Sequence, residues 1–266
     1  MSHIDHIVIN TSDRIDQVLA CFESMGFTVT PRGYHSSGTI NHTIVFNDNY
    51  LELLGYPTGK LPEHSSELIR RPIGLVATVL KTDDAEQMQN SLMLHGFNMS
   101  PVLNLSRPLD LGNGESMDVK FRVTTLECEV TPGTFLYYCQ HLTPELVWRS
   151  QWQTHANGCV TMVRLIINVN DLKAAVETYQ RAVDISEVKS IDKNRCIIRL
   201  FNFEIILTTD VNNPWGTQTL VLGTDSLEKV EAIFLQSGIN YLKEDQRIFA
   251  DTRACIGCAI EFESID

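Results

Sequence analysis

The chain carries at residues 4–26 the stretch IDHIVINTSDRIDQVLACFESMG, which sets the pattern for the rest of the sequence. Residues 4–10 alternate and are rich in β-branched side chains, as in a strand. Thr11-Ser12-Asp13 is a helix-start signal, and the apolar residues after it recur at the spacing of one helical face until Gly26. This stretch therefore predicts a strand followed by a helix.

Three further strands are expected after this helix, at residues 27–30, 40–46 and 50–54, with a glycine-rich loop at 33–39. The same order of strand, helix and strands starts again near residues 73, 160 and 217. In the second unit the later strands are expected near Phe97, at 117–126 and at 134–139. The sequence thus predicts four βαβββ modules of an α+β fold.

Size and charge limit the functions that this chain can have. Its 266 residues, 43% of them hydrophobic, can form two domains of about 130 residues each. The formal net charge is -12, and the sequence contains no run of Lys and Arg. A phosphate backbone needs a basic surface, so we do not expect nucleic acid as a partner.

The sequence also bears on where the protein acts. No apolar stretch reaches the length of a membrane span, and residues 1–6 do not have the basic and apolar pattern of a secretory signal. The seven cysteines are scattered and odd in number, unlike a disulfide framework. We therefore expect a cytoplasmic protein that does not bind membranes. A homodimer is compatible with the sequence, which leaves the oligomeric state open.

Several short motifs give the chain a resemblance to a known family. It resembles the vicinal oxygen chelate superfamily and, within it, is most similar to the glyoxalase-like domain family. The motifs are Asp5-His6-Ile7-Val8, Arg32-Gly33-Tyr34-His35, Gly38-Thr39-Ile40-Asn41, Tyr50-Leu51-Glu52-Leu53, Thr143-Pro144-Glu145-Leu146-Val147-Trp148 and His155-Ala156-Asn157-Gly158. The resemblance implies two tandem cups of the glyoxalase/bleomycin-resistance type: residues 1–145, a bridge at 146–158, and a degenerate second cup at 159–266.

The resemblance also implies a metal site in the first cup. Members of the superfamily hold a divalent metal with a histidine of the first strand and a glutamate of the last strand of each module. His6 and Glu52 match the first such pair. Imidazole and carboxylate suit Zn, Ni, Mn or Fe(II). A histidine like His6, taken alone, more often has a structural role in a core.

The second module departs from this pattern. Its first strand, residues 73–79, has no histidine, and its last strand offers Gln140 where a glutamate would be expected. Gln140 or His141 is then the candidate third ligand, and Gln140 is also a candidate contact to the substrate. Catalytic metals usually have three protein ligands, so a site with two would depend on water or substrate.

Two further residues of the first half are candidates for contact with a ligand. His35 lies in the glycine-rich loop, and an imidazole there can act as an acid or base, although a solvated loop histidine is an equal alternative. Asn41, in the next strand, can orient a carbonyl or carboxylate, or simply form hydrogen bonds within the sheet.

The second half lacks the residues for metal chemistry. All eight histidines precede Cys159. Ring-cleaving dioxygenases of the superfamily use two histidines and a glutamate, usually in the later half, so that activity is not expected. Alignment of the modules puts Arg164 at the position of His6. An arginine cannot ligate a cation, so we expect it to pair with a carboxylate, Glu261 first and Glu204 second.

Two functions remain open on these grounds. The first is a metal-assisted lyase or isomerase that acts on a small oxygenated metabolite, with His6 and Glu52 as ligands and His35 as the acid or base. The second is a metal-free protein that binds or sequesters a small molecule in the first cup. Motifs for phosphoryl transfer, serine hydrolysis, zinc peptidase activity and nicotinamide binding are missing from the sequence.

Overall fold

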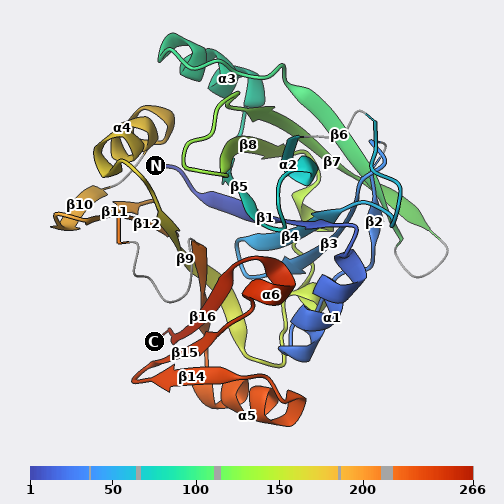
Figure 1. The fold of residues 1–266 in the computed structure, drawn as a ribbon. Coiled ribbons are helices and arrows are strands. Elements are labelled where there is room, and N and C mark those ends of the chain that lie inside the picture. The colour runs from blue at the N-terminus through green and yellow to red at the C-terminus, as the bar shows by residue number, and fades with distance from the viewer. Residues whose placement is uncertain (36, 64–66, 111–114, 185–186, 211–217, 266) are drawn as a thin grey trace.

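A computed structural model describes residues 1–35, 37–63, 67–110, 115–184, 187–210 and 218–265 (Figure 1). The first half contains β1 (Ile4–Ser12), α1 (Ile15–Ser24), β2 (Gly33–Tyr34), β3 (Ile40–Val45), β4 (Tyr50–Gly55), α2 (Glu67–Arg70), β5 (Gly74–Lys81), α3 (Ala85–Leu94), β6 (Leu103–Asp110), β7 (Ser116–Thr125) and β8 (Phe135–His141). Two short 3-10 helices follow, η1 (Pro144–Leu146) and η2 (Ser150–Trp152).

The second half repeats the order of the first. It contains β9 (Cys159–Asn168), α4 (Leu172–Ala182), β10 (Glu187–Asp192), β11 (Arg195–Arg199), β12 (Glu204–Thr208), β13 (Gln218–Thr224), α5 (Leu227–Ser237), β14 (Tyr241–Glu244), β15 (Arg247–Ala250), α6 (Arg253–Ile256) and β16 (Ala259–Ser264). In Figure 1 these elements, coloured gold to red, lie at the left and bottom of the molecule.

Each half forms one eight-stranded mixed sheet, and the two sheets have the same strand order. The orders are β2-β3-β4-β1-β5-β8-β7-β6 and β10-β11-β12-β9-β13-β16-β15-β14. In the first sheet β2 also contacts β6, so the two edge strands meet and the sheet curls into a cup. The four predicted βαβββ modules and the two-cup fold are thereby confirmed.

One strand in each module of the first half lies elsewhere than expected. Residues 27–30 form no strand, and the second strand of the first module is β2, inside the expected glycine-rich loop. The strand expected near Phe97 is reduced to an isolated bridge between Met99 and Leu126. The strand is instead β6, eight residues long, which pairs with β7 along its whole length. Leu103, Leu105 and Leu109 alternate with polar residues and Pro108 in this segment, a period that favours a strand.

A single hydrophobic cluster joins the two halves. It gathers residues from the outer faces of both sheets and from the helices that cover them, with Phe22 of α1 and Phe234 of α5 fully buried. Phe27 of the first half stacks against Phe262 of β16, with ring centroids 6.2 Å apart. Phe22 and Phe234 are deep enough that truncation of either to alanine should cost about 3–5 kcal/mol.

A β-bulge interrupts the pairing of β1 with β5. Ile4 pairs with Leu80 and His6 with Val79, so Asp5 is an extra residue in β1. A bulge turns two successive side chains toward one side of a sheet. Asp5 and His6 therefore face the inside of the cup together.

The second half contains the same irregularity at the equivalent place. Met162 pairs with Leu222 and Arg164 with Val221, which leaves Val163 as the extra residue of β9. These strand pairings confirm that Arg164 occupies the position of His6, because each of the two residues directly follows the extra residue of its bulge. By the same register, Ile206 of β12 stands where Glu52 stands in β4.

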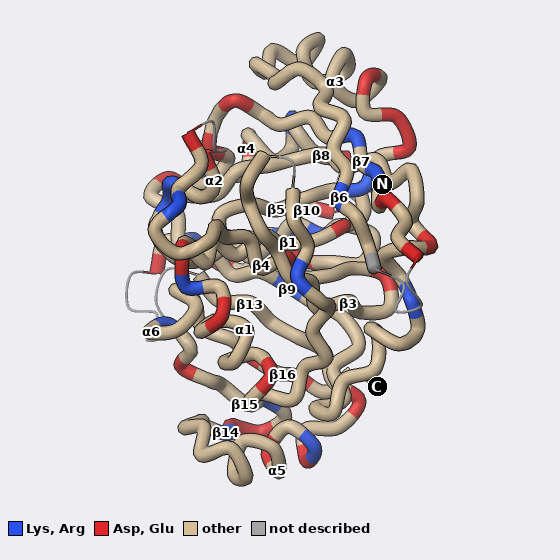
Figure 2. The backbone as a smooth tube through the Cα atoms, turned by 90° about the vertical axis from the view of Figure 1, so that its right-hand side faces the viewer, with Lys and Arg blue, Asp and Glu red and all other residues tan. Residues whose placement is uncertain are grey.

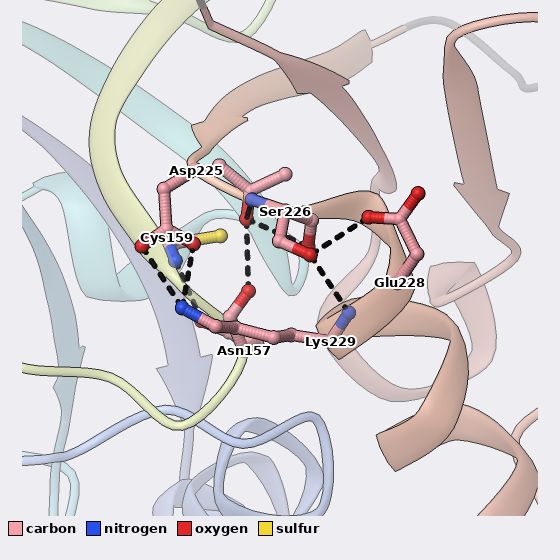
Figure 3. Close-up of polar contacts among 7 residues, drawn as sticks. Asn157, Cys159, Asp225, Ser226, Glu228 and Lys229 are labelled. Carbon is pink, nitrogen blue, oxygen red and sulfur yellow. Dashed lines mark hydrogen bonds and ion pairs between the residues drawn. The ribbon is translucent and has the colours of Figure 1, made fainter.

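The bridge between the sheets is anchored by buried polar side chains. Asn157 is fully buried, donates from Nδ2 to Met25 O at 2.9 Å and accepts Cys159 N at 3.0 Å. Its carbonyl accepts a hydrogen bond from Thr224. Figure 3 shows Asn157 next to Cys159 and close to Ser226, the residue that caps α5. The neighbouring Gly158 has φ +70°, and a Cβ there would lie 2.0 Å from Asp225 Oδ1.

His155 connects the bridge to the first sheet. Its Nδ1 accepts a hydrogen bond from Thr28 N at 3.0 Å, so the proton of the neutral ring is on Nε2, which donates to Val45 O at 3.1 Å. The ring lies edge-on to Phe27 and Phe46. Burial lowers the pKa of His155 to about 4, although the bond to Val45 opposes the shift.

Basic and acidic residues are scattered along the tube in Figure 2, and no long blue segment is seen on the part of the chain that the structure describes. None of the helices in the described ranges has the length and apolar composition needed to cross a membrane.

Candidate functional site

His6 and Glu52 approach each other inside the first cup. They lie on the adjacent parallel strands β1 and β4, and the distance between His6 Nε2 and Glu52 Oε2 is 3.7 Å. The His6 ring stacks on Tyr50, with ring centroids 4.3 Å apart. Both side chains are largely buried, at 8% and 15% exposure, so the pair faces a partly dehydrated interior.

Asp5 fixes the orientation of His6 from behind. The Asp5 carboxylate is fully buried and lies 2.6 Å from His6 Nδ1 and 3.0 Å from His141 Nε2. Burial alone would favour the neutral acid, but the charge of His141 and hydrogen bonds from both rings hold the pKa of Asp5 well below its usual range. Because Nδ1 lies against Asp5, Nε2 is the ring nitrogen of His6 that faces Glu52.

Glu52 is held by a second side chain. Asn41 Nδ2 donates to Glu52 Oε1 at 2.7 Å, which leaves Oε2 facing His6. Gly33 of β2 permits this arrangement, because a Cβ there would lie 2.3 Å from Asn41 Oδ1 and 3.0 Å from Arg107 Cδ. The bare backbone of Gly33 therefore brings Asn41 and Arg107 together.

His35 lies beside this group. Its Nδ1 is 2.7 Å from Thr39 Oγ1. Burial lowers the pKa of His35, the charge of Arg107 lowers it further, and the charge of Glu52 opposes both. His35 is therefore neutral at pH 7 and close enough to Glu52 and Arg107 to interact with their charges.

A second set of potential metal ligands lies deeper in the cup. Donor atoms of Asp5, Cys139 and His141 all lie within 4.8 Å of one another. Burial, together with the charges of Asp5 and Glu52, raises the pKa of Cys139 well above its usual value, so its sulfur is a neutral thiol. Asp5 already binds two imidazoles, those of His6 and His141, and a cation bound here would also have to displace the thiol proton of Cys139. This cluster is better explained as support for His6 than as a metal centre.

Apolar side chains surround the polar group. One buried cluster includes Val8 and Leu54, another includes Val45 and Tyr50, and Phe121 packs against both. Charges enclosed by such surfaces interact more strongly than in water.

Trp148 of the bridge covers one end of this interior. Its ring centroid lies 5.8 Å from that of Tyr50 and 4.9 Å from that of His141. Lys81 Nζ lies 4.4 Å from the centre of the Trp148 ring. The bridge thus contributes directly to the first cup.

A separate cavity of about 320 Å³ lies where the second half meets Pro132. Asn168, Thr209 and Gln218 are among its lining residues, and its described lining carries no ionisable side chain. Acid–base or metal chemistry therefore points to the first cup and not to this cavity.

The corresponding position of the second cup holds an ion-pair network. Arg164 donates to Glu263 at 2.7 Å and to Glu204 at 3.2 Å. The expectation that Glu261 is the main partner is wrong, because Glu261 pairs with Arg247 at 3.1 Å. Glu204, the second choice, is confirmed.

The structure brings together four of the five predicted site residues. His6, Glu52, Asn41 and His35 lie on or beside the inner face of the first sheet. Gln140 does not join them: its Nε2 donates to Asp83 O at 2.6 Å and its Oε1 accepts Ala85 N at the start of α3. Side chains alternate along β8, so Cys139 and His141 face inward and Gln140 faces outward.

Sequence reasoning missed two charged residues of this site. Asp5 was overlooked because strict alternation would direct it away from His6, and only the bulge brings it inward. Arg107 was overlooked because no strand was expected at residues 103–110. The apolar alternation of Leu103, Leu105 and Leu109 is the signal that could have placed Arg107 on an inner face.

Comparisons with solved structures agree with this architecture. A hypothetical protein from Staphylococcus aureus superposes with a TM-score of 0.69 and 14% identity over 100% of both chains. A mutant of 4-hydroxymandelate synthase from Streptomyces coelicolor superposes with a TM-score of 0.60 and 12% identity, and the match covers 99% of this chain and 92% of that one. A variant of homoprotocatechuate 2,3-dioxygenase from B. fuscum superposes with a TM-score of 0.59 and 13% identity, and the match covers 99% of this chain and 71% of that one. At these identities the likeness establishes the fold alone.

Sequence comparison gives the family. No curated protein sequence matches the chain. The sequence profile of the glyoxalase-like domain matches residues 4–183, more than half of the chain and the whole of the first cup. With the paired βαβββ modules and the inward-facing His6 and Glu52, this match shows that the chain belongs to the glyoxalase-like domain family.

Proposed function

We propose that the first cup binds a small oxygenated metabolite, and that a divalent cation held by His6 and Glu52 assists a lyase or isomerase reaction there. The observation that carries the proposal is the convergence of His6 Nε2 and Glu52 Oε2, 3.7 Å apart, with His6 held by Asp5. A carboxylate behind a ligating histidine is the usual outer-shell arrangement of metal sites.

The residues present fit a divalent cation. Two donors that are each about 2.1 Å from one ion lie roughly 3.0–3.5 Å apart at octahedral or tetrahedral angles, close to the observed separation. His141 is directed at Asp5, so the described residues supply two ligands, fewer than a two-histidine, one-carboxylate triad. The remaining positions would be left to water and substrate. Such a cation would act as a Lewis acid on a substrate oxygen.

His35 is the residue proposed to move the proton. Its lowered pKa keeps it neutral at pH 7 and therefore able to accept a proton. Thr39 occupies Nδ1, so Nε2 is the nitrogen available to a substrate. Asn41 positions Glu52, and the surrounding apolar residues exclude water from the reacting groups.

Metal-free binding of a small molecule is the second candidate. One observation favours it: Asp5 and Asn41 already give His6 and Glu52 protein partners, so the polar group is satisfied without an ion.

The test is to measure metal content after purification in chelator-free buffer, and then the affinity for Mn²⁺, Ni²⁺ and Zn²⁺ by calorimetry. His6→Ala and Glu52→Gln should each reduce affinity by at least about 10- to 100-fold, the loss typical of even an outer-shell partner. Glu261→Gln is the matched control, because it is the same carboxylate-to-amide change at a buried glutamate of the second cup, away from His6 and Glu52.

Proton transfer is tested separately. Small keto and hydroxy acids are incubated with the metal-loaded protein in D₂O and followed by NMR. The proposal predicts deuterium incorporation that is lost in His35→Gln. Equal metal affinity in wild type and Glu52→Gln would contradict the metal site, and ligand binding without metal or exchange would favour the second candidate.

A further inference from the structure

Arg107 is a buried cation in the first cup, at the place where the edge strands β2 and β6 meet. It lies on β6, opposite Val119 of β7, and only 5% of the residue is exposed. Its side chain passes over Gly33 of β2, where a Cβ would lie 3.0 Å from Arg107 Cδ and 3.3 Å from one guanidinium nitrogen. Directly opposed residues of paired strands share a face, so Arg107 faces inward with Val119.

No side chain or carbonyl among the described residues accepts a hydrogen bond from the Arg107 guanidinium or forms an ion pair with it. Glu52 is the carboxylate whose charge acts on it, and the two Glu52 oxygens face Asn41 and His6. Burial lowers the pKa of Arg107, yet arginine remains charged in proteins. A buried charge without a partner is strongly unfavourable.

Arg164 of the second cup provides an internal comparison. It is the less deeply buried of the two, and it donates three hydrogen bonds to Glu204 and Glu263. The second cup thus neutralises its inward arginine with two carboxylates of its own sheet. Since no carboxylate in the described ranges forms an ion pair with Arg107, an anion from outside the chain can take that place.

The wall next to Arg107 is apolar and accessible. Leu103 and Leu105 share its face of β6 and are 52% and 42% exposed. They lie opposite Val123 and Phe121 of β7. Exposed apolar side chains that converge beside a buried cation suit an amphipathic ligand.

We propose that Arg107 anchors the carboxylate of a small amphipathic acid, whose apolar body lies on the wall formed by Leu103, Leu105, Phe121 and Val123. The planar guanidinium can bind a carboxylate through two parallel hydrogen bonds. The inference deepens the proposed function and rests on the first cup being the ligand site, but it does not require the metal.

The test uses two acids, phenylacetate and hexanoate, and their neutral amides, phenylacetamide and hexanamide. Binding is measured by calorimetry and by the shift in Tm, both with EDTA and with Mn²⁺. For ligands of this size we expect a Kd on the order of 1 mM for the acids. The amides should bind at least about 10-fold more weakly, since a hydrogen bond to a charged group contributes about 10- to 100-fold.

Arg107→Met should reduce the affinity for both acids by the same factor, and Arg107→Lys by less. Arg164→Met is the matched control and should leave the affinity unchanged. A second readout does not need a ligand: Arg107→Met should raise the Tm of the free protein, because it removes an unpaired buried charge, whereas Arg164→Met should lower it.

Equal binding of acids and amides, unchanged affinity in Arg107→Met, or a response to inorganic phosphate alone would overturn the inference. Acid binding that depends on Arg107 but not on metal would support it even if the metal proposal fails. Metal binding at His6 and Glu52 without acid binding would leave the metal proposal intact and overturn this one.

Discussion

Lowering the pH from 7 to 5 should destabilise the wild-type protein by about 2 kcal/mol more than a His155→Gln variant. The reason is the hydrogen bonding of His155. Its Nδ1 accepts Thr28 N, so a second ring proton would point at an N–H donor inside the protein. Burial adds to this effect, and the pKa of His155 falls to about 4 from the usual 6.5.

The magnitude follows from linkage. The folded pKa lies below the unfolded value, so the unfolded chain binds the proton first and stability is lost as the pH falls below 6.5. The loss continues down to the folded pKa of about 4, where it reaches about 3 kcal/mol. At pH 7 this penalty is close to zero, and at pH 5 it is about 2 kcal/mol.

The assay is urea unfolding at pH 7 and pH 5, followed by tryptophan fluorescence and circular dichroism. His155→Gln should be less stable than wild type at pH 7 by about 2 kcal/mol, because two buried hydrogen bonds change. It should lose less stability on acidification. His95→Gln, at an exposed histidine, is the control and should follow wild type. Equal losses in wild type and His155→Gln would refute the reasoning.

Three further outcomes are expected. Asp5→Asn should weaken metal binding by about 10- to 100-fold without removing a ligand, because His6 loses its charged partner; unchanged calorimetric affinity would contradict the role assigned to Asp5. Gly33→Ala should lower both the Tm and the affinity for the acids, since the new Cβ would meet Asn41 and Arg107. An unchanged Tm and an unchanged acid affinity would show that β2 and β6 can move apart to make room for it. Arg164→Met should lower the free energy of unfolding in urea by about 1–2 kcal/mol, because two carboxylates lose their partner at a half-buried site. Metal binding in the first cup should persist in this variant, and its loss would place the site in the second half.

The fold could be predicted because local signals repeat and agree. Asp84, Asp171 and Ser226 each cap the start of a helix through a side-chain oxygen, at places where the sequence has a helix-start signal. The strand-helix-strand order recurs four times, although the first helix, α1, has no side-chain cap, and this repetition defined the modules without any knowledge of long-range contacts.

The site was only partly predictable, for reasons of backbone register. His6 and Glu52 follow from family positions, but the inward turn of Asp5 depends on one unpaired residue in a ladder. The choice of Glu263 over Glu261 by Arg164 depends likewise on diagonal contacts across strands. Such pairings are set when sheets assemble, and the pattern within one strand does not encode them.

The bulge shared by β1 and β9 makes the second cup a ready scaffold for engineering. Its backbone already offers an extra inward residue and a neighbouring strand in the right register, with Arg164 and Ile206 at the positions of His6 and Glu52. Three substitutions, Val163→Asp, Arg164→His and Ile206→Glu, would copy the Asp-His-Glu constellation onto the other half without altering a loop or a strand length. The two halves thus allow the proposed site to be tested by transplanting its side chains onto an equivalent backbone of the same chain.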